Sequence, residues 1–414
     1  MLFLYNFSIS LYYFLIKTYR YFNPKAWLWI EGRKNIFEKI SKEVDSNLPS
    51  VWFHFASLGE FEQGRPVLEQ VRHSYPGYKL IVTFFSPSGY ELRKNYKNAD
   101  HIFYLPLDTK QNAIKFLQLV NPTLAFFTKY EFWFHYFNEL HKKKTPIVVI
   151  SAIFRNSQPF FKWYGTLNRS ILSFVDHFFV QDQNSKTLLN KINLTNVTVS
   201  GDTRFDRVAE NARKPTEFEK VTAFCAGYKV FVAGSTWPDD EKLICKLFQR
   251  FPDWKFIIAP HEIKEEKIAS LFEIAGNTSI VRYSKLNTAS DFQVLVIDNI
   301  GMLSSLYQYA DVSYIGGGFG VGIHNTLEAA AFGVPIIFGP NYHKFREAKA
   351  LINLGVGFSI GNVSELNLVM QTLKDDQKRK QVGDTARKYV LQETGATETI
   401  MKYIEKLIPK QPAG

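Results

Sequence analysis

Short apolar segments rich in Val, Ile and Phe alternate with helix-length segments between residues 51 and 340. The apolar segments are continuous rather than interrupted by polar residues, which is typical of parallel strands that are buried on both faces. A first series lies at 51–55, 79–85, 101–106, 123–128, 146–151, 177–181 and 197–200, and a second at 229–235, 255–260, 279–282, 293–298, 311–318 and 334–340. The pattern therefore predicts an α/β protein with two doubly wound parallel sheets.

The two series are separated by a charged segment that contains a proline and no strand. A chain of 414 residues is also too long for one ordinary core, since domains usually hold about 100–200 residues. We expect an N-terminal segment at 1–40, a Rossmann-like domain at 41–206, a linker at 207–228 and a second Rossmann-like domain at 229–414, whose last helix could pack back on the first domain. Ligands of open parallel sheets bind beyond the carboxyl ends of the strands, so we expect the site in a cleft that the two domains face.

The chain has a formal net charge of +11, which predicts an anionic partner: a nucleic acid, a phosphorylated substrate or an acidic membrane surface. Charge alone does not choose among these. The two cysteines, Cys225 and Cys245, are too few for a disulfide framework or a cysteine-based metal site. A reducing, cytosolic setting is therefore expected.

Residues 1–16 carry no charge and are followed by a basic, aromatic segment at 17–39. A membrane-spanning helix needs about 20 apolar residues, and this stretch is shorter and interrupted by Asn6, Ser8 and Ser10. It has neither a cleavage site of small residues nor a basic region before the apolar part, which argues against a cleaved signal peptide. We expect a helix that lies in the interface of an anionic membrane. A spanning helix that leaves the rest of the chain in the cytoplasm, and a helix packed on the protein's own core, are the alternatives.

Ser57, Gly59 and Glu60 follow the first predicted strand. The two small residues would let the backbone approach a ligand, and Glu60 would project into the site at the start of a helix at 61–73. The helix dipole is expected to lower the pKa of Glu60 and keep it ionised, ready to accept a proton. The alternative is that Glu60 only complements the helix dipole, which stabilises a helix by about 0.3–1 kcal/mol.

Two more residues follow strands of the first series. Glu131, after the strand at 123–128, would place a second acid at the same edge of the sheet. Arg204, after the strand at 197–200, has a planar guanidinium that binds phosphate or carboxylate through two hydrogen bonds.

In the second series, Gly234, Ser235 and Thr236 lie between a strand and the start of a helix. Exposed amides and hydroxyls at a helix N-terminus suit a phosphate, although an ordinary helix cap would look the same. The acids at 239–241 fit the first turn of a helix better than a metal cluster, and we expect no metal site. His261 follows the next strand at the same edge; alone, such a histidine is more often a cap or a surface residue.

A glycine-rich loop follows the strand at 311–318 and leads into a predicted helix that carries Glu328. Its residues are Gly316, Gly317, Gly318, Gly320 and Gly322, followed by His324 and Asn325. The next strand does not end in the acid that an NAD site requires, and no P-loop motif occurs. The loop suits a nucleotide whose phosphate lies on the glycines and whose ribose lies on Glu328; purely structural glycines are the alternative.

Six motifs occur in order along the chain: HxxSxGE at 54–60, EFW at 131–133, GDTRFDR at 201–207, GSTW at 234–237, Pro260-His261, and a GGG…HNxLE element at 316–335. In this combination the chain resembles the 3-deoxy-D-manno-octulosonic acid (Kdo) transferases of lipopolysaccharide synthesis. The resemblance implies a GT-B fold with an N-terminal membrane-associated helix, CMP-Kdo as donor, and a lipid A precursor, lipid IVA, as acceptor. It also implies an inverting reaction that needs no metal or cofactor, at the cytoplasmic face of the inner membrane and without nucleic acid.

The same resemblance implies roles for individual residues. Glu60 matches the general base and Glu131 a second acidic site residue, whereas Ser57, Gly59 and Arg204 would contact substrate. CMP-Kdo would be held by Gly234, Ser235, Thr236, His261, Gly316, Gly317, Gly318, Gly320, Gly322, His324, Asn325 and Glu328. The chain departs from the family pattern at Gly322-Ile323, where a second glycine is common, and at residues 130–134, where TELWP is common.

Two other functions are compatible with these residues. A GT-B transferase that uses a UDP-sugar is the nearest alternative, because none of the residues predicted to bind the nucleotide distinguishes cytosine from uracil. A non-catalytic protein that binds lipid surfaces would explain the charge and the N-terminus, but not two acids together with a nucleotide-type loop.

Overall fold

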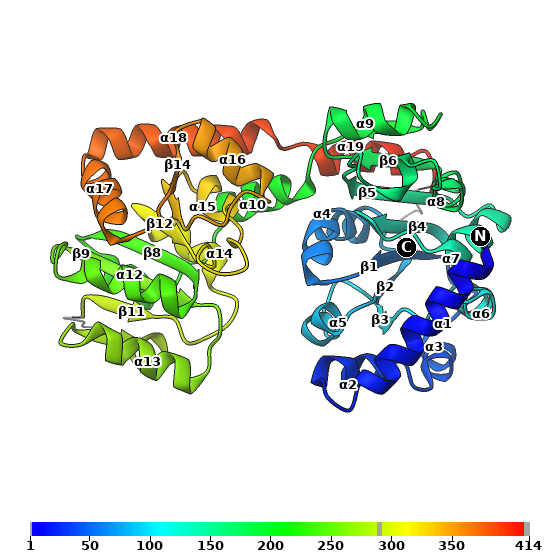
Figure 1. The fold of residues 1–414 in the computed structure, drawn as a ribbon, viewed down its shortest axis with the longest axis horizontal. Helices are drawn as coiled ribbons and strands as arrows, with labels where there is room; N and C mark the ends of the chain where they lie inside the picture. The colour runs from blue at the N-terminus through cyan, green and yellow to red at the C-terminus, as the bar shows by residue number, and fades with distance from the viewer. Residues whose placement is uncertain (1, 288–291, 410–414) are drawn as a thin grey trace. The chain divides into compact units, whose positions relative to one another are not determined.

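The computed structural model describes residues 2–287 and 292–409 (Figure 1). The chain folds into two compact units: unit 1 comprises residues 1–206 and 394–414, and unit 2 comprises residues 207–393. Each unit is built around one seven-stranded sheet in which all strands are parallel. The α/β class and the parallel sheets predicted from the sequence are therefore confirmed.

The sheet of unit 1 has the strand order β3-β2-β1-β4-β5-β6-β7. Its strands are β1 (Ser50–Phe55), β2 (Lys79–Phe84), β3 (His101–Tyr104), β4 (Pro122–Thr128), β5 (Ile147–Ala152), β6 (His177–Val180) and β7 (Val197–Val199). Every residue of the central strand β1 is buried, as its unbroken apolar sequence predicted.

Two cores, one on each face of this sheet, fix the helices of unit 1. One core joins the sheet to α3 (Ile36–Glu43), α6 (Lys110–Val120), α7 (Phe134–Lys142) and α8 (Thr166–Leu172). The other joins it to α4 (Leu58–Ser74) and to α19 (Ala396–Ile404), which packs on α4. α9 (Gln183–Asn190) also contributes to the first core, and α5 (Pro87–Arg93) packs on α4. The last helix of the chain thus belongs to unit 1.

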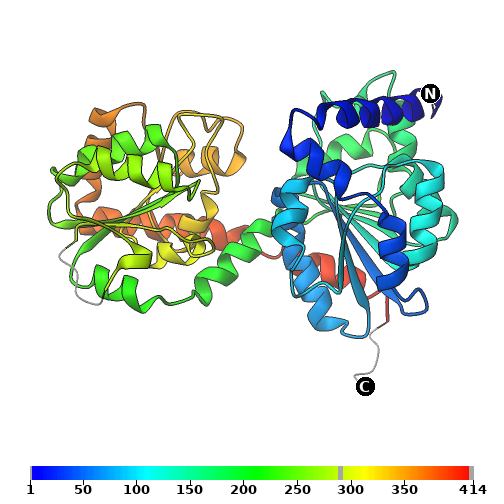
Figure 2. The same ribbon diagram turned by 90° about the horizontal axis from the view of Figure 1, so that it is seen from below.

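The N-terminal helix α1 (Leu2–Tyr19) runs along the outside of unit 1, next to α2 (Pro24–Glu31) (Figure 2). None of its residues is buried. Among the described residues, no helix combines the length and the apolar character needed to cross a membrane.

The sheet of unit 2 has the order β10-β11-β9-β8-β12-β13-β14. Its strands are β8 (Lys229–Thr236), β9 (Trp254–Pro260), β10 (Ile280–Arg282), β11 (Val294–Val296), β12 (Val312–Ile315), β13 (Ile336–Phe338) and β14 (Gly357–Ser359). The sequence did not predict β14, because it has three residues at the edge of the sheet and only Gly357 is buried.

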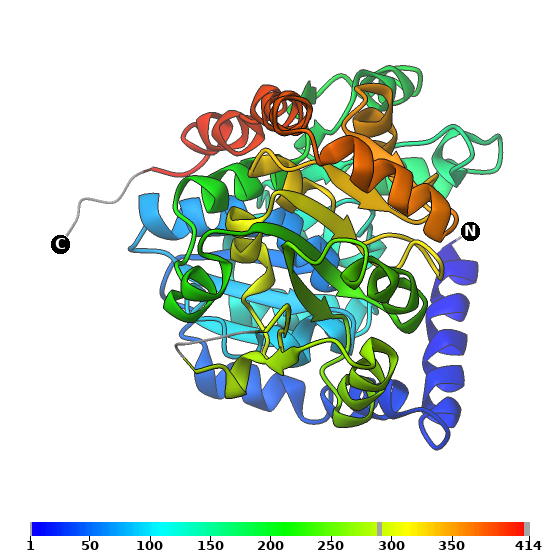
Figure 3. The ribbon, with the colours of Figure 1, turned by 90° about the vertical axis from the view of Figure 1, so that its left-hand side faces the viewer.

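Helices lie on both faces of this sheet (Figure 3). One face carries α12 (Pro238–Phe248), α13 (Glu265–Ala275) and α17 (Val363–Leu373), which share one apolar core. The other helices of unit 2 that follow β8 are α14 (Leu303–Leu306), α15 (Leu327–Ala331), α16 (Arg346–Asn353) and α18 (Asp376–Gln392). The segment expected as a linker, 207–228, contains most of α10 (Thr203–Arg213) and all of α11 (Glu219–Cys225).

Candidate active site

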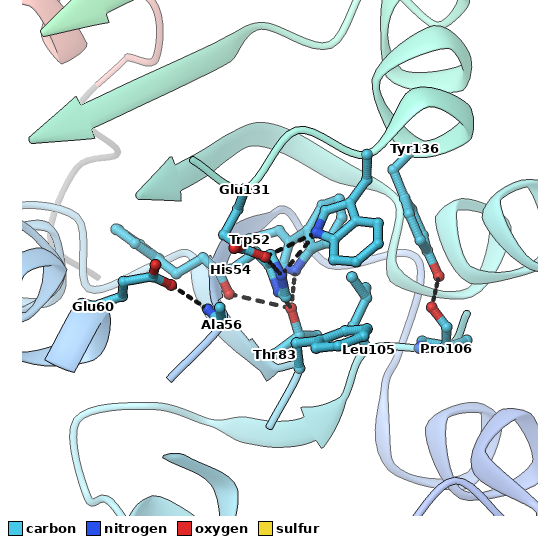
Figure 4. Close-up of polar contacts among 12 residues, drawn as sticks. Trp52, His54, Ala56, Glu60, Thr83, Leu105, Pro106, Glu131 and Tyr136 are labelled. Atoms are coloured by element: carbon cyan, nitrogen blue, oxygen red, sulfur yellow. Dashed lines mark hydrogen bonds and ion pairs between the residues drawn. The ribbon is translucent and has the colours of Figure 1, made fainter. Parts of the chain in front are cut away.

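In unit 1, Glu60 lies at the carboxyl end of β1, in the first turn of α4. The helix begins at Leu58, three residues earlier than expected, with Ser57 as its N-cap residue. The Glu60 carboxylate accepts a hydrogen bond from the backbone N–H of Ala56 at 2.6 Å (Figure 4). Glu60 therefore accepts from a backbone donor at the start of α4. Stabilising this end of the helix, the alternative considered from the sequence, is thus one of its roles.

The pKa of Glu60 is raised to about 7. Burial is the largest cause and the negative charge of Glu131 the second, whereas the Ala56 N–H and Lys129 act in the opposite direction. The expectation that the helix end would lower this pKa was wrong, because burial and a neighbouring carboxylate outweigh the backbone donors. A carboxylate with a pKa near 7 is suited to general base catalysis at neutral pH.

Glu131 reaches the same edge because β1 and β4 are neighbours in the sheet. One oxygen of its carboxylate, Oε2, accepts a hydrogen bond from the indole N–H of Trp133 at 3.1 Å. The same oxygen lies 3.3 Å from Nε2 of His54, a fully buried residue of β1. The structure thus brings Glu60 and Glu131 together (Figure 4), and the hydrogen bonds add His54 and Trp133 as partners of Glu131.

Two contributors to this cluster were not singled out from the sequence. Thr83 lies in β2 and contacts the other ring nitrogen of His54, Nδ1, at 2.8 Å. Lys129, directly after β4, has a left-handed backbone (φ 59°) and a charge that acts on Glu60. The only feature of the sequence that could have pointed to Thr83 is that it is a polar residue inside the apolar segment 79–85.

Arg204 lies close to the same helix. Its guanidinium pairs with the buried Asp202 at 2.8 Å, and Asp202 in turn accepts a hydrogen bond from Gln63 of α4. Gln63 lies about one helical turn after Glu60. Gly59 is exposed, and a side chain there would meet only the Ser57 hydroxyl, at 4.0 Å, so packing does not require a glycine.

In unit 2, the residues predicted for the nucleotide lie where β8, β9 and β12 end. Ser235 has a left-handed backbone (φ 54°), and α12 begins at Pro238. The Thr236 hydroxyl donates a hydrogen bond to Glu241 at 2.9 Å. Among the described residues, no group of three or more His, Cys, Asp or Glu side chains is arranged to hold a metal.

The glycine-rich loop is tightly packed against the protein. A Cβ atom on Gly316 would lie 2.2 Å from the carbonyl oxygen of Ser235, and one on Gly318 would lie 2.6 Å from Gly339. The N–H of Gly317 (φ 90°) donates to the buried carboxylate of Asp240 at 2.9 Å. The packing and backbone conformation thus require glycine at these three positions, whether or not a ligand binds. The N–H of Gly317 is already hydrogen-bonded to Asp240. Gly320 and Gly322 follow in the same loop, which closes through a hydrogen bond from the N–H of Gly322 to Gly317.

His261 and His324 meet in a stack with Trp237. The ring centroids of Trp237 and His261 are 4.6 Å apart, and those of His261 and His324 are 4.5 Å apart. The Trp237 indole N–H donates to Nε2 of His324 at 3.3 Å. Burial, followed by the charge of His261, lowers the pKa of His324 to about 4, so that its ring is neutral at pH 7. The sequence did not indicate that its GSTW, Pro-His and HN elements form one aromatic group.

Asn325 and Glu328 are paired by a hydrogen bond from the Asn325 amide to the Glu328 carboxylate at 3.1 Å. Asn325 also accepts from the N–H of Leu327, where α15 begins. Burial raises the pKa of Glu328, and the charge of Arg207 opposes this rise. Arg207, the last residue of the GDTRFDR motif, is therefore a further charged residue at this site.

Residues 30–207 match a family model described as 3-deoxy-D-manno-octulosonic-acid transferase (kdotransferase). A 3-deoxy-D-manno-octulosonic acid transferase of Chlamydophila psittaci is 26% identical over 384 residues, which cover 89% of this chain and 87% of the relative. One from Aquifex aeolicus is 26% identical over 347 residues, which cover 82% of this chain and 90% of the relative.

Solved structures with the same fold include a UDP-GlcNAc 2-epimerase from Neisseria meningitidis (TM-score 0.61, 16% identity, covering 86% of this chain and 100% of that one). Another is MurG from Acinetobacter baumannii (TM-score 0.55, 12% identity, covering 86% and 100%). At these identities the likeness concerns the fold, and it agrees with the GT-B architecture expected from the sequence.

Proposed function

We propose, from the premise that this chain belongs to the Kdo transferase family and is a glycosyltransferase, that it moves Kdo from CMP-Kdo to lipid IVA with Glu60 as general base. The observation that carries the proposal is the environment of Glu60. Its carboxylate lies at the carboxyl edge of a parallel sheet, next to Glu131, and burial with the charge of Glu131 raises its pKa to about 7. Such a group is ionised at slightly alkaline pH and basic enough to accept a proton from a sugar hydroxyl.

The reaction is a single displacement. The acceptor hydroxyl donates a hydrogen bond to Glu60, and its oxygen attacks the anomeric carbon of Kdo on the face opposite to CMP. The bond between this carbon and the phosphate oxygen breaks, the bond to the acceptor oxygen forms, and Glu60 takes the proton. CMP leaves as an anion, and the configuration of the anomeric carbon is inverted. No metal or cofactor has a step in this scheme.

Unit 2 would hold the donor. Ser235 and Thr236 lie just before the N-terminus of α12, where backbone N–H groups and the helix dipole favour a phosphate. The stack of Trp237, His261 and His324 offers flat rings beside this position, and His261 is exposed. The paired Asn325 and Glu328 supply oxygen acceptors for ribose hydroxyls.

The acceptor is a lipid, and α1 would keep the enzyme at the cytoplasmic face of the inner membrane. Large apolar side chains of α1 are exposed, among them Phe3 (78%), Phe7 (57%) and Phe14 (60%). Two polar residues of the same helix face the protein instead: Tyr5 donates to Asp108, and Asn6 lies 2.7 Å from Nε2 of His135. A helix that is held by polar contacts and leaves several phenylalanines exposed is suited to an anionic membrane interface.

A transfer assay followed by mass spectrometry tests the proposal. Purified protein in detergent or reconstituted vesicles receives CMP-Kdo and lipid IVA, with a chelator present. A product heavier by one or more Kdo units, together with released CMP, is the expected result. A folded protein that binds UDP but not CMP, in a thermal-shift measurement, would instead favour a transferase that uses a UDP-sugar.

A further inference from the structure

A line of hydrogen bonds runs through the core of unit 1 and ends at Glu131 (Figure 4). The indole N–H of Trp52 donates to Oγ1 of Thr83 at 2.8 Å. The same Thr83 oxygen lies 2.8 Å from Nδ1 of His54, and Nε2 of His54 lies 3.3 Å from Oε2 of Glu131. The side chains of Trp52, Thr83 and His54 are fully buried, so water does not compete for these contacts.

The geometry of Thr83 decides the direction of these hydrogen bonds. Trp52 can only donate, so the Thr83 oxygen accepts from it and has one proton left to give. That proton can go to Nδ1 of His54 at 2.8 Å or to the carbonyl oxygen of Phe53 at 3.5 Å. The shorter contact is much the better hydrogen bond. Nδ1 of His54 is then the acceptor, and the proton of the neutral ring is on Nε2.

This arrangement also satisfies Glu131. With its proton on Nε2, His54 donates to Oε2 of Glu131, and the Trp133 indole N–H donates to the same oxygen at 3.1 Å. Two donors on one oxygen fix the position of the Glu131 carboxylate. In the other tautomer, Trp133 would donate to His54 at 3.2 Å and Glu131 would lose the His54 donor.

We propose that Trp52, Thr83 and His54 form a relay that fixes His54 as the Nε2–H tautomer and thereby holds the Glu131 carboxylate in position beside Glu60. His54 is a positioning residue: it touches no reacting atom and acts through Glu131. The relay itself is independent of substrate, and its importance for catalysis rests on the proposed function, because only a base at Glu60 would use the charge that the relay keeps in place.

The charge of Glu131 reaches Glu60 directly. The charged groups that act on Glu60 are Glu131, which raises its pKa, and Lys129, which lowers it. Tyr130 lies between these two in the chain and has a raised pKa, caused first by burial. If the relay is broken, Glu131 loses the His54 donor that holds its carboxylate near Glu60. A Glu131 carboxylate that turns away raises the pKa of Glu60 less, and Glu60 then titrates at lower pH.

The tautomer can be measured without any substrate. In protein labelled with ¹⁵N-histidine, the resonances of His54 are assigned by their absence from a His54→Gln variant. We expect Nδ1 to resonate in the unprotonated range and Nε2 in the protonated range at pH 7.5. A proton on Nδ1 of His54 would overturn the relay, and this result needs only the wild-type protein and an assignment spectrum.

The second test follows the Glu60 carboxyl carbon in ¹³C-glutamate-labelled protein, assigned with Glu60→Gln. His54→Leu removes the donor to Glu131, whereas His54→Gln keeps an N–H at about the same place and is the matched control. We expect His54→Leu and Glu131→Gln each to lower the titration midpoint of Glu60 by about one pH unit or more. His54→Gln should stay close to the wild type. A midpoint that moves in Glu131→Gln but not in a folded His54→Leu variant would contradict the relay.

These measurements separate the relay from the proposed function. If transfer activity is absent but the tautomer and the Glu60 midpoints are as expected, the relay stands and the reaction must be another one. If activity is present, the acid limb of the kcat/KM profile should move with the Glu60 midpoint in the same variants. A loss of activity with no change of the limb would mean that His54 has only a structural role.

Discussion

Asp206 and Thr397, which lie 191 positions apart, are joined by two hydrogen bonds of 2.7 Å. One carboxylate oxygen accepts from both the backbone N–H and the hydroxyl of Thr397, and the other accepts from the N–H of Gly395 at 2.6 Å. These are the first residues of α19, whose N-terminal amides would otherwise lack partners. Asp206 therefore ties the start of α19 to the rest of unit 1.

Replacing Asp206 with Ala should destabilise α19 by about 1–3 kcal/mol, the effect of losing a charged helix cap with several hydrogen bonds. Asp206→Asn, which keeps an oxygen acceptor of the same shape, is the matched control and should lose less. Hydrogen exchange of the amides of α19 reports the change directly. Equal exchange in the Ala variant and the wild type would show that the packing of α19 on α4 suffices without the cap.

Glu60→Gln should abolish most of the transfer activity while CMP binding is retained. Removal of a general base typically costs about 10²–10⁴-fold in rate, and Gln keeps the shape and the acceptor for the Ala56 N–H. In the wild type, kcat/KM should fall about tenfold per pH unit below about pH 7, because Glu60 must be unprotonated to act. Steady-state kinetics from pH 5.5 to 8.5 checks both statements, and full activity of Glu60→Gln would remove Glu60 as the base.

The same substitution should stabilise unit 1 at alkaline pH. The pKa of Glu60 is about 7 in the folded state and near 4.5 when unfolded, so the folded state binds the extra proton between these values. Above pH 7 the buried carboxylate is charged and costs free energy of order 1–3 kcal/mol. Hydrogen exchange of β1 and β4 at pH 8 should therefore be slower in Glu60→Gln than in wild type, and this difference should shrink as the pH falls below 7 and vanish below about pH 4.5.

The fold could be predicted because the burial of its strands can be recognised in the sequence. Strands that are buried on both faces appear as unbroken apolar segments, such as 51–55 and 123–128. The short edge strand β14 has no such segment and was missed. Glu60 and Glu131 could be predicted as neighbours, since both follow strands of one parallel sheet. The pKa of Glu60 could not be predicted. The direction of its shift depends on how strongly burial and Glu131 raise it and how strongly Lys129 lowers it, which only the three-dimensional structure shows.

The partners of the site residues were equally out of reach. Nothing in the sequence pairs Thr83 with His54, or places Trp237, His261 and His324 in one stack, because these contacts depend on which strands are neighbours and how far each extends. The glycine-rich loop was predicted from its composition alone. Its tight packing on Ser235 and Gly339 explains Gly316 and Gly318 without any ligand, and the left-handed backbone of Gly317 explains a third glycine.

The aromatic side chains of α1 should control binding to membranes. Phe3→Ser together with Phe14→Ser should reduce co-sedimentation with vesicles of anionic lipid at least about tenfold, since even partial burial of two such side chains contributes more than 1 kcal/mol. Leu368→Ser, at an exposed apolar residue of α17 in unit 2, is the control for a change in general surface character. Unchanged sedimentation of the double variant would mean that α1 is not the membrane contact.

His324 should make the stability of unit 2 depend on pH in the acid range. Its pKa is about 4 in the folded state, lowered first by burial and then by the charge of His261, against an ordinary value of 6.5. Between these values the unfolded chain binds a proton that the folded chain does not. The stabilisation is therefore complete above about pH 6.5 and is lost progressively as the pH falls toward 4.

His324→Gln, which keeps an acceptor for the indole N–H of Trp237, should remove this contribution. Hydrogen exchange of β8 and β12, measured at pH 7.5 and pH 5 and corrected for intrinsic rates, gives the free energy of opening at each pH. The wild type should lose more stability between the two pH values than the variant does, and His73→Gln on the exposed side of α4 controls for the loss of a histidine elsewhere. An equal loss in wild type and His324→Gln would show that His324 is protonated as readily in the folded chain as in the unfolded one.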